Sequence, residues 1–196
     1  MATIYLIPTP IGNLEDISLR ALRLLKEVDA IAAEDTRHSL KLLSHYGIQK
    51  PLLRLDSHTM SLRAPQILAE YNTIAFISDA GSPGISDPGE DLVRIALARG
   101  DKVEALPGAT AFVPALVLSG LACNRFTFEG FLPRKGSHRR QRLEAIVKSP
   151  VTVCLYESPQ RIMSTLEDLA EHCGEDRQAS LSREISKQYE NHYRGA

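Results

Sequence analysis

The sequence is short of cysteine, of net charge and of long hydrophobic runs, and each shortage excludes a class of protein. Its three cysteines, Cys123, Cys154 and Cys173, form no Cys-X-X-Cys pair, so we expect neither a disulfide framework nor a zinc site. The net charge of −1 provides no global basic field for a nucleic acid, so only a local patch could bind one. No run approaches the roughly 20 apolar residues of a membrane span, and the N-terminus lacks the basic start of a secretion signal. We therefore expect a cytoplasmic protein without a membrane anchor.

Common nucleotide-binding and hydrolase motifs are also absent. The first apolar segment is not followed by Gly-X-Gly-X-X-Gly, and neither Gly-X-X-X-X-Gly-Lys-Ser/Thr nor Gly-X-Ser-X-Gly occurs. Interpretations as a dinucleotide-binding enzyme, a P-loop nucleotidase or an α/β-hydrolase therefore lose their main support.

Short apolar segments alternate with segments of helical periodicity. With 43% hydrophobic and 24% charged residues, the 196-residue chain has enough apolar mass for a core. Expected strands cover residues 3–7, 30–33, 52–55, 73–77, 102–106, 125–129, 151–156 and 178–182. Expected helices cover residues 17–28, 40–46, 62–71, 91–98, 141–147 and 162–172, with Asp16 as the first N-cap and Gly47 just after the second helix. This alternation predicts an α/β protein with a mostly parallel sheet.

A division near Ser119–Ala122 would separate two α/β halves, which we place at residues 1–119 and 120–196. No flexible linker composition marks this boundary. The second half stops just after a strand and a polar segment, so we expect it to be incomplete at its C-terminus.

Three turn-rich segments follow expected strands: Pro8–Asn13, Asp79–Gly89 and Pro107–Thr110. In open α/β sheets, ligands bind at the carboxyl ends of the strands. Glycine lets a ligand approach the backbone, and proline fixes the shape of a loop. Both residues also punctuate ordinary turns, which explains any single segment equally well. Three such segments at one edge favour a binding cleft for a small, nucleotide-like ligand.

Three polar segments also follow expected strands. The first, Ala33-Glu-Asp-Thr-Arg-His, is either a catalytic cluster or a solvated helix start, since Asp35 and Thr36 are good caps whatever the function. The other two are Leu155-Tyr-Glu-Ser-Pro-Gln-Arg and Ser182-Arg-Glu-Ile-Ser-Lys. Together they supply candidate acids, bases and cations at strand ends.

A basic cluster interrupts this near-neutral chain; its members are Arg134, Lys135, Arg139, Arg140 and Arg142. A solvated helix start is the plainer interpretation, although basic residues there oppose the helix dipole. Clustering against that preference favours contacts with phosphates, which dominate nucleic-acid affinity. Phe131, just before the cluster, could stack on a base, although a core role for such aromatic residues is the commoner one.

Six segments are spread in order over the chain: Ile4-Tyr-Leu-Ile-Pro-Thr-Pro-Ile-Gly-Asn-Leu, Ala33-Glu-Asp-Thr-Arg, Ser78-Asp-Ala-Gly-Ser-Pro, Leu106-Pro-Gly, Glu129-Gly-Phe-Leu-Pro and Tyr156-Glu-Ser-Pro-Gln-Arg. In these segments the chain resembles the bacterial 16S ribosomal RNA 2′-O-ribose methyltransferase I family, within the tetrapyrrole methylase superfamily. The resemblance implies a two-domain class III methyltransferase fold with S-adenosylmethionine in a cleft between the domains. It also implies a longer protein, acting as a homodimer, that methylates the 2′-hydroxyl of a cytidine in 16S rRNA, free or within the 30S subunit.

The same resemblance implies cofactor contacts. The residues it indicates are Pro10, Ile11, Gly12, Asp79, Ala80, Gly81, Pro83, Thr110, Ala111, Tyr156 and Glu157. The Asp-Ala-Gly turn stands where other tetrapyrrole methylases carry a Gly-Asp-Pro-like turn, which leaves its individual contacts open. The Arg134–Arg142 cluster would bring RNA to the cofactor.

Methyl transfer from a sulfonium to a ribose hydroxyl needs positioning and a group that takes the hydroxyl proton. The candidate catalytic residues are Glu34, Asp35, Arg37, Arg183, Glu184 and Lys187. We expect Glu34, Asp35 or Glu184 to orient or deprotonate the hydroxyl, while Arg37 or Arg183 holds the neighbouring phosphate. No metal is needed for this reaction, and no His/Cys cluster offers a site.

Three alternatives stay open. A methylase of a porphyrin precursor would share the fold, and a non-catalytic RNA-binding ribosome-assembly module could retain the cofactor pocket. A nucleotide hydrolase could hold Mg²⁺ on Glu34, Asp35 and Asp79, but it would lack a P-loop. The basic cluster and the Glu-Asp-Thr-Arg segment favour the RNA-modifying branch.

Overall fold

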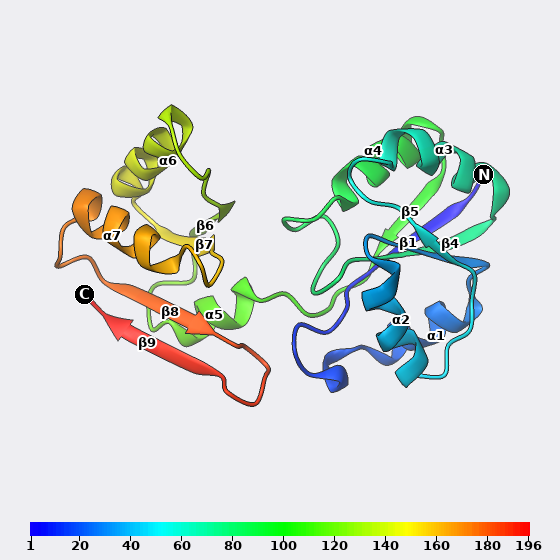
Figure 1. Cartoon of the computed structure of the whole chain (residues 1–196), viewed down its shortest axis with the longest axis horizontal. Coiled ribbons are helices and arrows are strands. Elements are labelled where there is room, and N and C mark those ends of the chain that lie inside the picture. The colour runs from blue at the N-terminus through cyan, green and yellow to red at the C-terminus, as the bar shows by residue number, and fades with distance from the viewer. The chain divides into compact units, whose positions relative to one another are not determined.

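Five parallel strands form the sheet of the first of two compact units, Met1–Thr110, in the computed structural model of residues 1–196. They are β1 (Thr3–Ile7), β2 (Ala30–Ala33), β3 (Leu52–Arg54), β4 (Thr73–Ile77) and β5 (Lys102–Ala105). Their order in the sheet is β3-β2-β4-β1-β5 (Figure 1). All neighbouring strands are parallel, and Ile4 of β1 lies opposite both Ile74 and Val103. The expected parallel α/β sheet is confirmed.

Two helices cover each face of this sheet, because successive strand residues point to opposite faces. Ile4 and Phe76 pack on one face with α3 (Met60–Glu70) and α4 (Gly89–Ala98). Ile7 and Ile77 pack on the other face with α1 (Leu19–Glu27) and α2 (Thr36–His45). Burial on both faces explains why these strands read as continuous apolar runs in the sequence.

Local sequence determines where the first helices begin. A short 3-10 helix, η1 (Leu14–Asp16), precedes α1, and the Ser18 hydroxyl caps α1 by accepting from the Ala21 N–H at 3.0 Å. The expectation that Asp16 caps this helix is wrong, because Asp16 ends η1 instead. Asp35 caps α2, as expected, and Gly47 follows α2 with a φ of 63°. Glycine adopts that left-handed conformation without strain.

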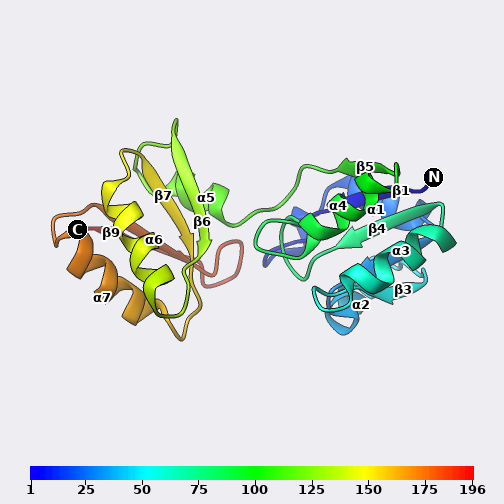
Figure 2. The ribbon, with the colours of Figure 1, turned by 90° about the horizontal axis from the view of Figure 1, so that it is seen from above.

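The second compact unit, Ala111–Ala196, has smaller sheets. In it, β6 (Phe126–Phe131) and β7 (Thr152–Tyr156) pair in parallel, and β8 (Ala179–Arg183) and β9 (Asn191–Gly195) form an antiparallel hairpin. Its helices are α5 (Phe112–Leu118), α6 (Ser137–Lys148) and α7 (Ile162–Cys173). Figure 2 shows β6 and β7 side by side with α6 next to them. The buried core cluster contains only Leu132, Leu143 and Ile146, with partly buried residues around it.

Helix α5 and strand β9 are absent from the sequence-based prediction. Phe112, at the start of α5, stacks on Phe128 with ring centroids 4.7 Å apart, and its N–H donates to the Tyr156 hydroxyl at 3.3 Å. These contacts attach α5 to β6 and β7, whereas the boundary expected after residue 119 would leave α5 in the first unit. No helix in the chain combines the length and the apolar character needed to cross a membrane.

Candidate functional site

The three glycine- and proline-rich loops of the first unit meet at the carboxyl ends of β1, β4 and β5, which are adjacent and parallel. Thr9 and Gly81 exchange two backbone hydrogen bonds of 2.9 Å. The Ser82 hydroxyl donates to the Ala109 carbonyl at 3.1 Å and lies 2.6 Å from the Thr110 hydroxyl. The expected convergence of the loops at one edge is confirmed. We call these three loops, residues 8–13, 79–88 and 107–110, the loop edge.

Main-chain atoms form much of the surface of the loop edge, because glycine residues occupy the positions where the loops contact one another. A Cβ on Gly108 would lie 2.6 Å from the Cβ of Pro8, so the third loop lies directly against the first. Gly81 has a φ of 85°, and a Cβ there would lie 3.5 Å from Cγ2 of Ile11. A surface of this kind lets a ligand approach the main chain closely. The cofactor contacts expected of individual residues in these loops stay predictions.

Three carboxylates surround the loop edge: Glu34 follows β2, Asp79 follows β4, and Asp87 lies in the loop before α4. Burial raises the pKa of Glu34, and the charges of Asp79, Asp56 and Asp35 raise it further. Burial, together with the charges of Glu34 and Asp79, raises the pKa of Asp87 to about 6. Oδ1 of Asp79 is buried and has no hydrogen-bond partner. Because a buried acceptor without a partner is costly, this cluster suits a ligand that brings positive charge or hydrogen-bond donors.

The neighbouring Asp35 is already committed to Arg37. Its Oδ1 accepts from the Arg37 N–H at 2.9 Å, and its Oδ2 pairs with Nη2 of Arg37 at 2.9 Å. Hydrogen bonds from the Arg37 side chain and backbone lower the pKa of Asp35 to about 2. A carboxylate with so low a pKa is a weak base at neutral pH. Of the Glu34/Asp35 pair, Glu34 is therefore better suited to accept a proton.

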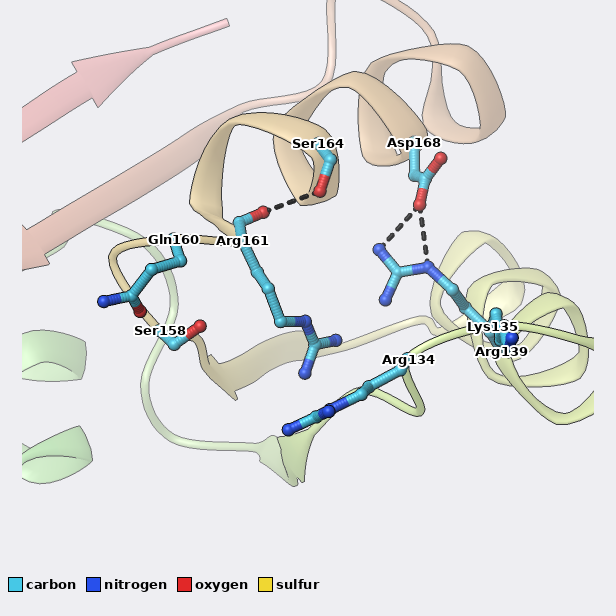
Figure 3. A pocket seen from close by; sticks show the side chains of 8 residues that line it. All are labelled: Arg134, Lys135, Arg139, Ser158, Gln160, Arg161, Ser164 and Asp168. Atoms are coloured by element: carbon cyan, nitrogen blue, oxygen red, sulfur yellow. Dashed lines mark hydrogen bonds and ion pairs between the residues drawn. The ribbon is translucent and has the colours of Figure 1, made fainter.

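A groove of about 710 Å³ in the second unit contains three of the five basic residues expected to bind RNA (Figure 3). The β6–α6 loop and α6 supply Arg134, Lys135 and Arg139. The β7–α7 loop and α7 supply Ser158, Gln160, Arg161, Ser164 and Asp168. We call this site the basic groove.

Two of the five basic residues are held by carboxylates. The Arg139 side chain is 11% exposed, and its Nε and Nη2 bond to Oδ2 of Asp168 at 2.7 and 2.6 Å. Arg142, outside the basic groove, pairs with Glu129. The members of the cluster without an ion pair are Arg134, Lys135 and Arg140. The structure therefore separates cations that are structural from cations that are available to a ligand.

Tyr156 and Glu157, expected at the cofactor, form bonds within the second unit. The Glu157 side chain is 5% exposed, and its Oε2 accepts from the Thr165 hydroxyl at 2.8 Å and pairs with Arg161 at 3.2 Å. The Tyr156 ring packs edge-on against Phe128, with centroids 4.9 Å apart. Glu157 thus orders the start of α7, Tyr156 packs against β6, and the contacts of both with the cofactor stay predictions.

The remaining catalytic candidates lie in the turn between β8 and β9. Arg183 ends β8, and Glu184 has a φ of 53° with its carboxylate 3.2 Å from Nζ of Lys187. A non-glycine residue in this left-handed conformation is uncommon and holds some strain. The turn therefore brings these three candidates together in the second unit. Ala111, the N-cap of α5, also belongs to that unit.

Comparison with known proteins identifies the family. A family model for tetrapyrrole (corrin/porphyrin) methylases matches residues 3–196. A Pseudomonas aeruginosa protein named ribosomal RNA small subunit methyltransferase I is 47% identical over 191 residues, covering 96% of this chain and 68% of that protein. The chain belongs to the ribosomal RNA small subunit methyltransferase I family. A Haemophilus influenzae member is 50% identical, covering 95% of this chain and 67% of the relative, and a Thermotoga maritima member is 43% identical, covering 100% and 88%. The resemblance found in the motifs is confirmed.

Solved structures of other methyltransferases have the same fold as this methyltransferase I family member. Uroporphyrin-III C-methyl transferase from Thermus thermophilus, complexed with S-adenosyl homocysteine, matches with a TM-score of 0.69 at 20% identity, over 99% of this chain and 83% of that chain. A cobalt precorrin-4 methyltransferase matches with a TM-score of 0.73 at 14% identity, over 98% and 84%. At such low identity these matches show the fold alone, and they confirm the expected class.

Two residues at the candidate sites of this methyltransferase I family member, Asp87 and Arg161, were not predicted from the sequence. Asp87 lies within the Asp79–Gly89 loop, but only the folded loop buries it beside Glu34 and Asp79. Arg161 ends the Tyr156-Glu-Ser-Pro-Gln-Arg segment, which was noticed as a motif without a role for its last residue. A carboxylate inside a glycine-rich loop and an arginine at a helix start were the available signals.

Proposed function

We propose that this chain transfers the methyl group of S-adenosylmethionine to the 2′-hydroxyl of a cytidine in small-subunit ribosomal RNA. The observation that carries the proposal is the 47–50% identity, over 95–96% of this chain, to proteins named ribosomal RNA small subunit methyltransferase I. From the family resemblance, the enzyme acts in the cytoplasm as a homodimer, on 16S rRNA that is free or within the 30S subunit.

The loop edge fits the cofactor chemically. When bound, S-adenosylmethionine supplies a methyl group on a cationic sulfur that an oxygen nucleophile can accept. The backbone of Ile11, Gly81 and Thr110 would lie along it, since these residues form the glycine-lined surface. The unpaired Oδ1 of Asp79 would accept a hydrogen bond from one of its donor groups. The negative charge of the surrounding carboxylates favours a positively charged ligand.

Glu34 takes the role of proton acceptor in this proposal. The Glu34 carboxylate would take the proton of the ribose 2′-hydroxyl as that oxygen accepts a methyl group; S-adenosylmethionine would supply the methyl group, with the carbon–sulfur electron pair kept on sulfur. The raised pKa of Glu34 brings this group closer to the range of an efficient general base. Arg37, whose side chain is 90% exposed, or Arg183 holds the neighbouring phosphate, and Glu184 remains a second candidate base.

The alternatives receive less support. Against a porphyrin precursor as substrate, the relatives matched along nearly all of this chain are named for ribosomal RNA. The relatives are named methyltransferases, which favours catalysis over a non-catalytic RNA-binding module. For the Mg²⁺-dependent hydrolase, no three His, Cys, Asp or Glu residues are arranged to hold a metal ion.

Methyl incorporation tests the proposal. The chain is incubated with labelled S-adenosylmethionine and, in parallel, with 30S subunits, naked 16S rRNA and a tetrapyrrole. We expect label at a ribose 2′-oxygen of rRNA, located by resistance of one phosphodiester bond to alkaline cleavage. Label in the tetrapyrrole alone would assign the chain to the porphyrin branch, and RNA binding without any label would favour the non-catalytic module.

A further inference from the structure

The basic groove carries an excess of positive charge that the fold does not neutralise. Its four cations, Arg134, Lys135, Arg139 and Arg161, are opposed by only two nearby carboxylates, those of Asp168 and Glu157. Asp168 is occupied by Arg139, whose Nη1 also donates to the Pro133 carbonyl at 2.9 Å. The uncompensated charge therefore lies on the side of the groove formed by Arg134 and Lys135.

Arg161 is positioned to bind an anion on that side. Its Nη2 donates to the Leu132 carbonyl at 2.8 Å and pairs with the buried Glu157 at 3.2 Å, and these bonds orient its side chain. Neither Nε nor Nη1 of Arg161 has a hydrogen bond, so the three N–H groups on these two nitrogens remain as donors. In Figure 3 the Arg161 side chain extends from the start of α7 toward Arg134, while Arg139 turns to Asp168. A guanidinium fixed in this way loses little entropy when it binds a second anion.

The N-terminal ends of α6 and α7, which carry partial positive charge, also lie at the basic groove. Helix α6 begins after Gly136 with no side-chain cap and no acidic residue in its first turn, and α7 begins after Arg161 without a side-chain cap. The first backbone N–H groups of a helix lack partners within it and favour negative charge nearby. At α7 the N–H groups of Arg161 and Ile162 already donate to the Ser158 carbonyl at 3.0 and 3.1 Å, so α6 has the freer start. The start of α6, with the charges of Arg134, Lys135 and Arg161, therefore indicates one anion site of the second unit.

We propose that the basic groove binds a backbone phosphate of the RNA, held by Arg161 and by the charges of Arg134 and Lys135. This inference rests on the proposed function for its substrate; it keeps Arg134 and Lys135 of the expected five-residue cluster and adds Arg161. Arg139 is a positioning residue that fixes the wall of the groove through Asp168. A phosphate oxygen can accept a charge-assisted hydrogen bond from Nε or Nη1 of Arg161, which are the guanidinium nitrogens left without a partner. The carboxylate of S-adenosylmethionine is the other anion available, and the test separates the two.

Salt-dependent RNA binding tests the groove. The double variant Arg134→Ala/Lys135→Ala is compared with the unmodified chain in binding a short single-stranded RNA of mixed sequence at several salt concentrations. The slope of log K against log salt is negative, and each lost phosphate contact makes it less steep by about 0.7 for single strands. For the double variant we expect a slope less steep by about 0.7 to 1.4, and affinity weaker by about tenfold at 0.15 M salt. The loss should be equal on a pyrimidine-only RNA, because phosphate contacts carry no base information.

The matched control is Lys148→Ala/Arg177→Ala. Lys148 ends α6 and Arg177 follows α7, so the same charge is removed at the opposite ends of the same two helices, about 16 Å away for a helix of twelve residues. This control should keep the slope of the unmodified chain. Arg161→Lys, which keeps a positive charge beside Glu157 but removes the Nε and Nη1 donors, should raise KM for RNA several-fold with kcat unchanged.

Three outcomes decide the matter. An equal loss of slope in both double variants would reduce the effect to net charge and overturn the groove. Weaker S-adenosylmethionine binding in Arg134→Ala/Lys135→Ala with an unchanged RNA slope would also overturn it, since the anion would then be the cofactor carboxylate. If the unmodified chain methylates no RNA yet the slope still depends on Arg134 and Lys135, the proposed function fails while the phosphate site stands.

Discussion

The candidate site of the first compact unit is formed mainly by main-chain atoms, and that of the second mainly by side chains. In the first unit the loop edge is made by backbone, as the paired main chains of Thr9 and Gly81 show. In the second unit the basic groove is made by long side chains, as the Arg139–Asp168 pair shows. Their charges also differ: carboxylates surround the loop edge, and cations line the groove. This division suits a cationic cofactor in one unit and an anionic RNA in the other.

The cores explain why the units differ. The central strands of the first unit are buried on both faces, with Ile4, Ile7 and Ile74 at most 1% exposed. Such strands fix the ends of their loops through the backbone. In the second unit every residue of β7 is only half-buried, and the core cluster is small. There, hydrogen bonds and ion pairs between side chains contribute more of the local order. Small residues should therefore matter most in the first unit, and charges in the second.

The largest expected effect tests whether the chemistry belongs to the first unit. Glu34→Gln should lower kcat for methyl transfer about 100-fold or more, since positioned general bases contribute roughly that much. Asp35→Asn should cost less than about tenfold, because asparagine also caps helices and Asp35 is a weak base. Single-turnover methylation at saturating cofactor measures both. Equal losses would contradict the assignment, and a large loss in Glu184→Gln alone would move the base to the second unit.

The next effect tests the role of charge in the second unit. Asp168→Ala leaves the nearly buried Arg139 without its carboxylate, which should lower the free energy of unfolding by about 2 kcal/mol, less than a fully buried pair would lose. Glu129→Ala removes the partner of Arg142, whose side chain is 48% exposed, and should cost about 0.5 kcal/mol. Urea unfolding followed by circular dichroism compares the two. A smaller loss for Asp168→Ala than for Glu129→Ala would contradict the structural role assigned to the Arg139–Asp168 pair.

A glycine substitution makes the matching test of backbone packing in the first unit. Gly108→Ala places a methyl group 2.6 Å from Cβ of Pro8, so the first and third loops must separate. Overpacking of this kind costs about 1 to 2 kcal/mol and should weaken cofactor binding as well. Gly195→Ala is the control, because nothing lies within 4 Å of its added Cβ, and its effect should stay within about 0.5 kcal/mol. Calorimetric titration with S-adenosylmethionine and thermal unfolding provide the two measurements.

Regular elements were predicted from the sequence better than single contacts. Strand β4 was placed at its observed bounds, and α7 begins at the expected residue, because apolar periodicity is a local signal. Helix α5 has seven residues with Pro114 inside, too short for a periodic pattern. Strand β9 is polar and exists through its pairing with β8, which local sequence does not reveal.

The candidate sites show the same difference between features that local sequence predicts and contacts that it does not. The three loops could be predicted because glycine and proline mark turns after strands, and the parallel sheet brings the strand ends together. The ion pair of Arg139 with Asp168 joins residues 29 positions apart, and the raised pKa of Asp87 depends in part on the charge of Glu34 in another loop. Such pairings depend on the tertiary fold, which is why the sequence overestimated the available cations and missed Asp87 and Arg161.

The smallest expected effect is a pH dependence that belongs to the first unit. Folding raises the pKa of Asp87 to about 6, above its value in the unfolded chain. The folded state therefore favours the protonated form, and the stability this group contributes is present below about pH 4 and is lost as the pH rises through 6. The difference in pKa corresponds to at most about 3 kcal/mol, and solvent screening of this half-buried group reduces the expected effect to about 1 kcal/mol.

Asp87→Asn should thus unfold with a free energy about 1 kcal/mol higher than the unmodified chain at pH 7.5, with no difference near pH 4. Hydrogen exchange of the β1 and β4 amides reports on the first unit. Asp101→Asn is the control of opposite sign: despite burial, hydrogen bonds from the Ala2 N–H and Arg99 lower the pKa of Asp101, so its removal should destabilise at neutral pH and matter less as the pH falls. A pH-independent effect of Asp87→Asn would show that Asp87 ionises freely, and the carboxylates at the loop edge would then not be held against one another.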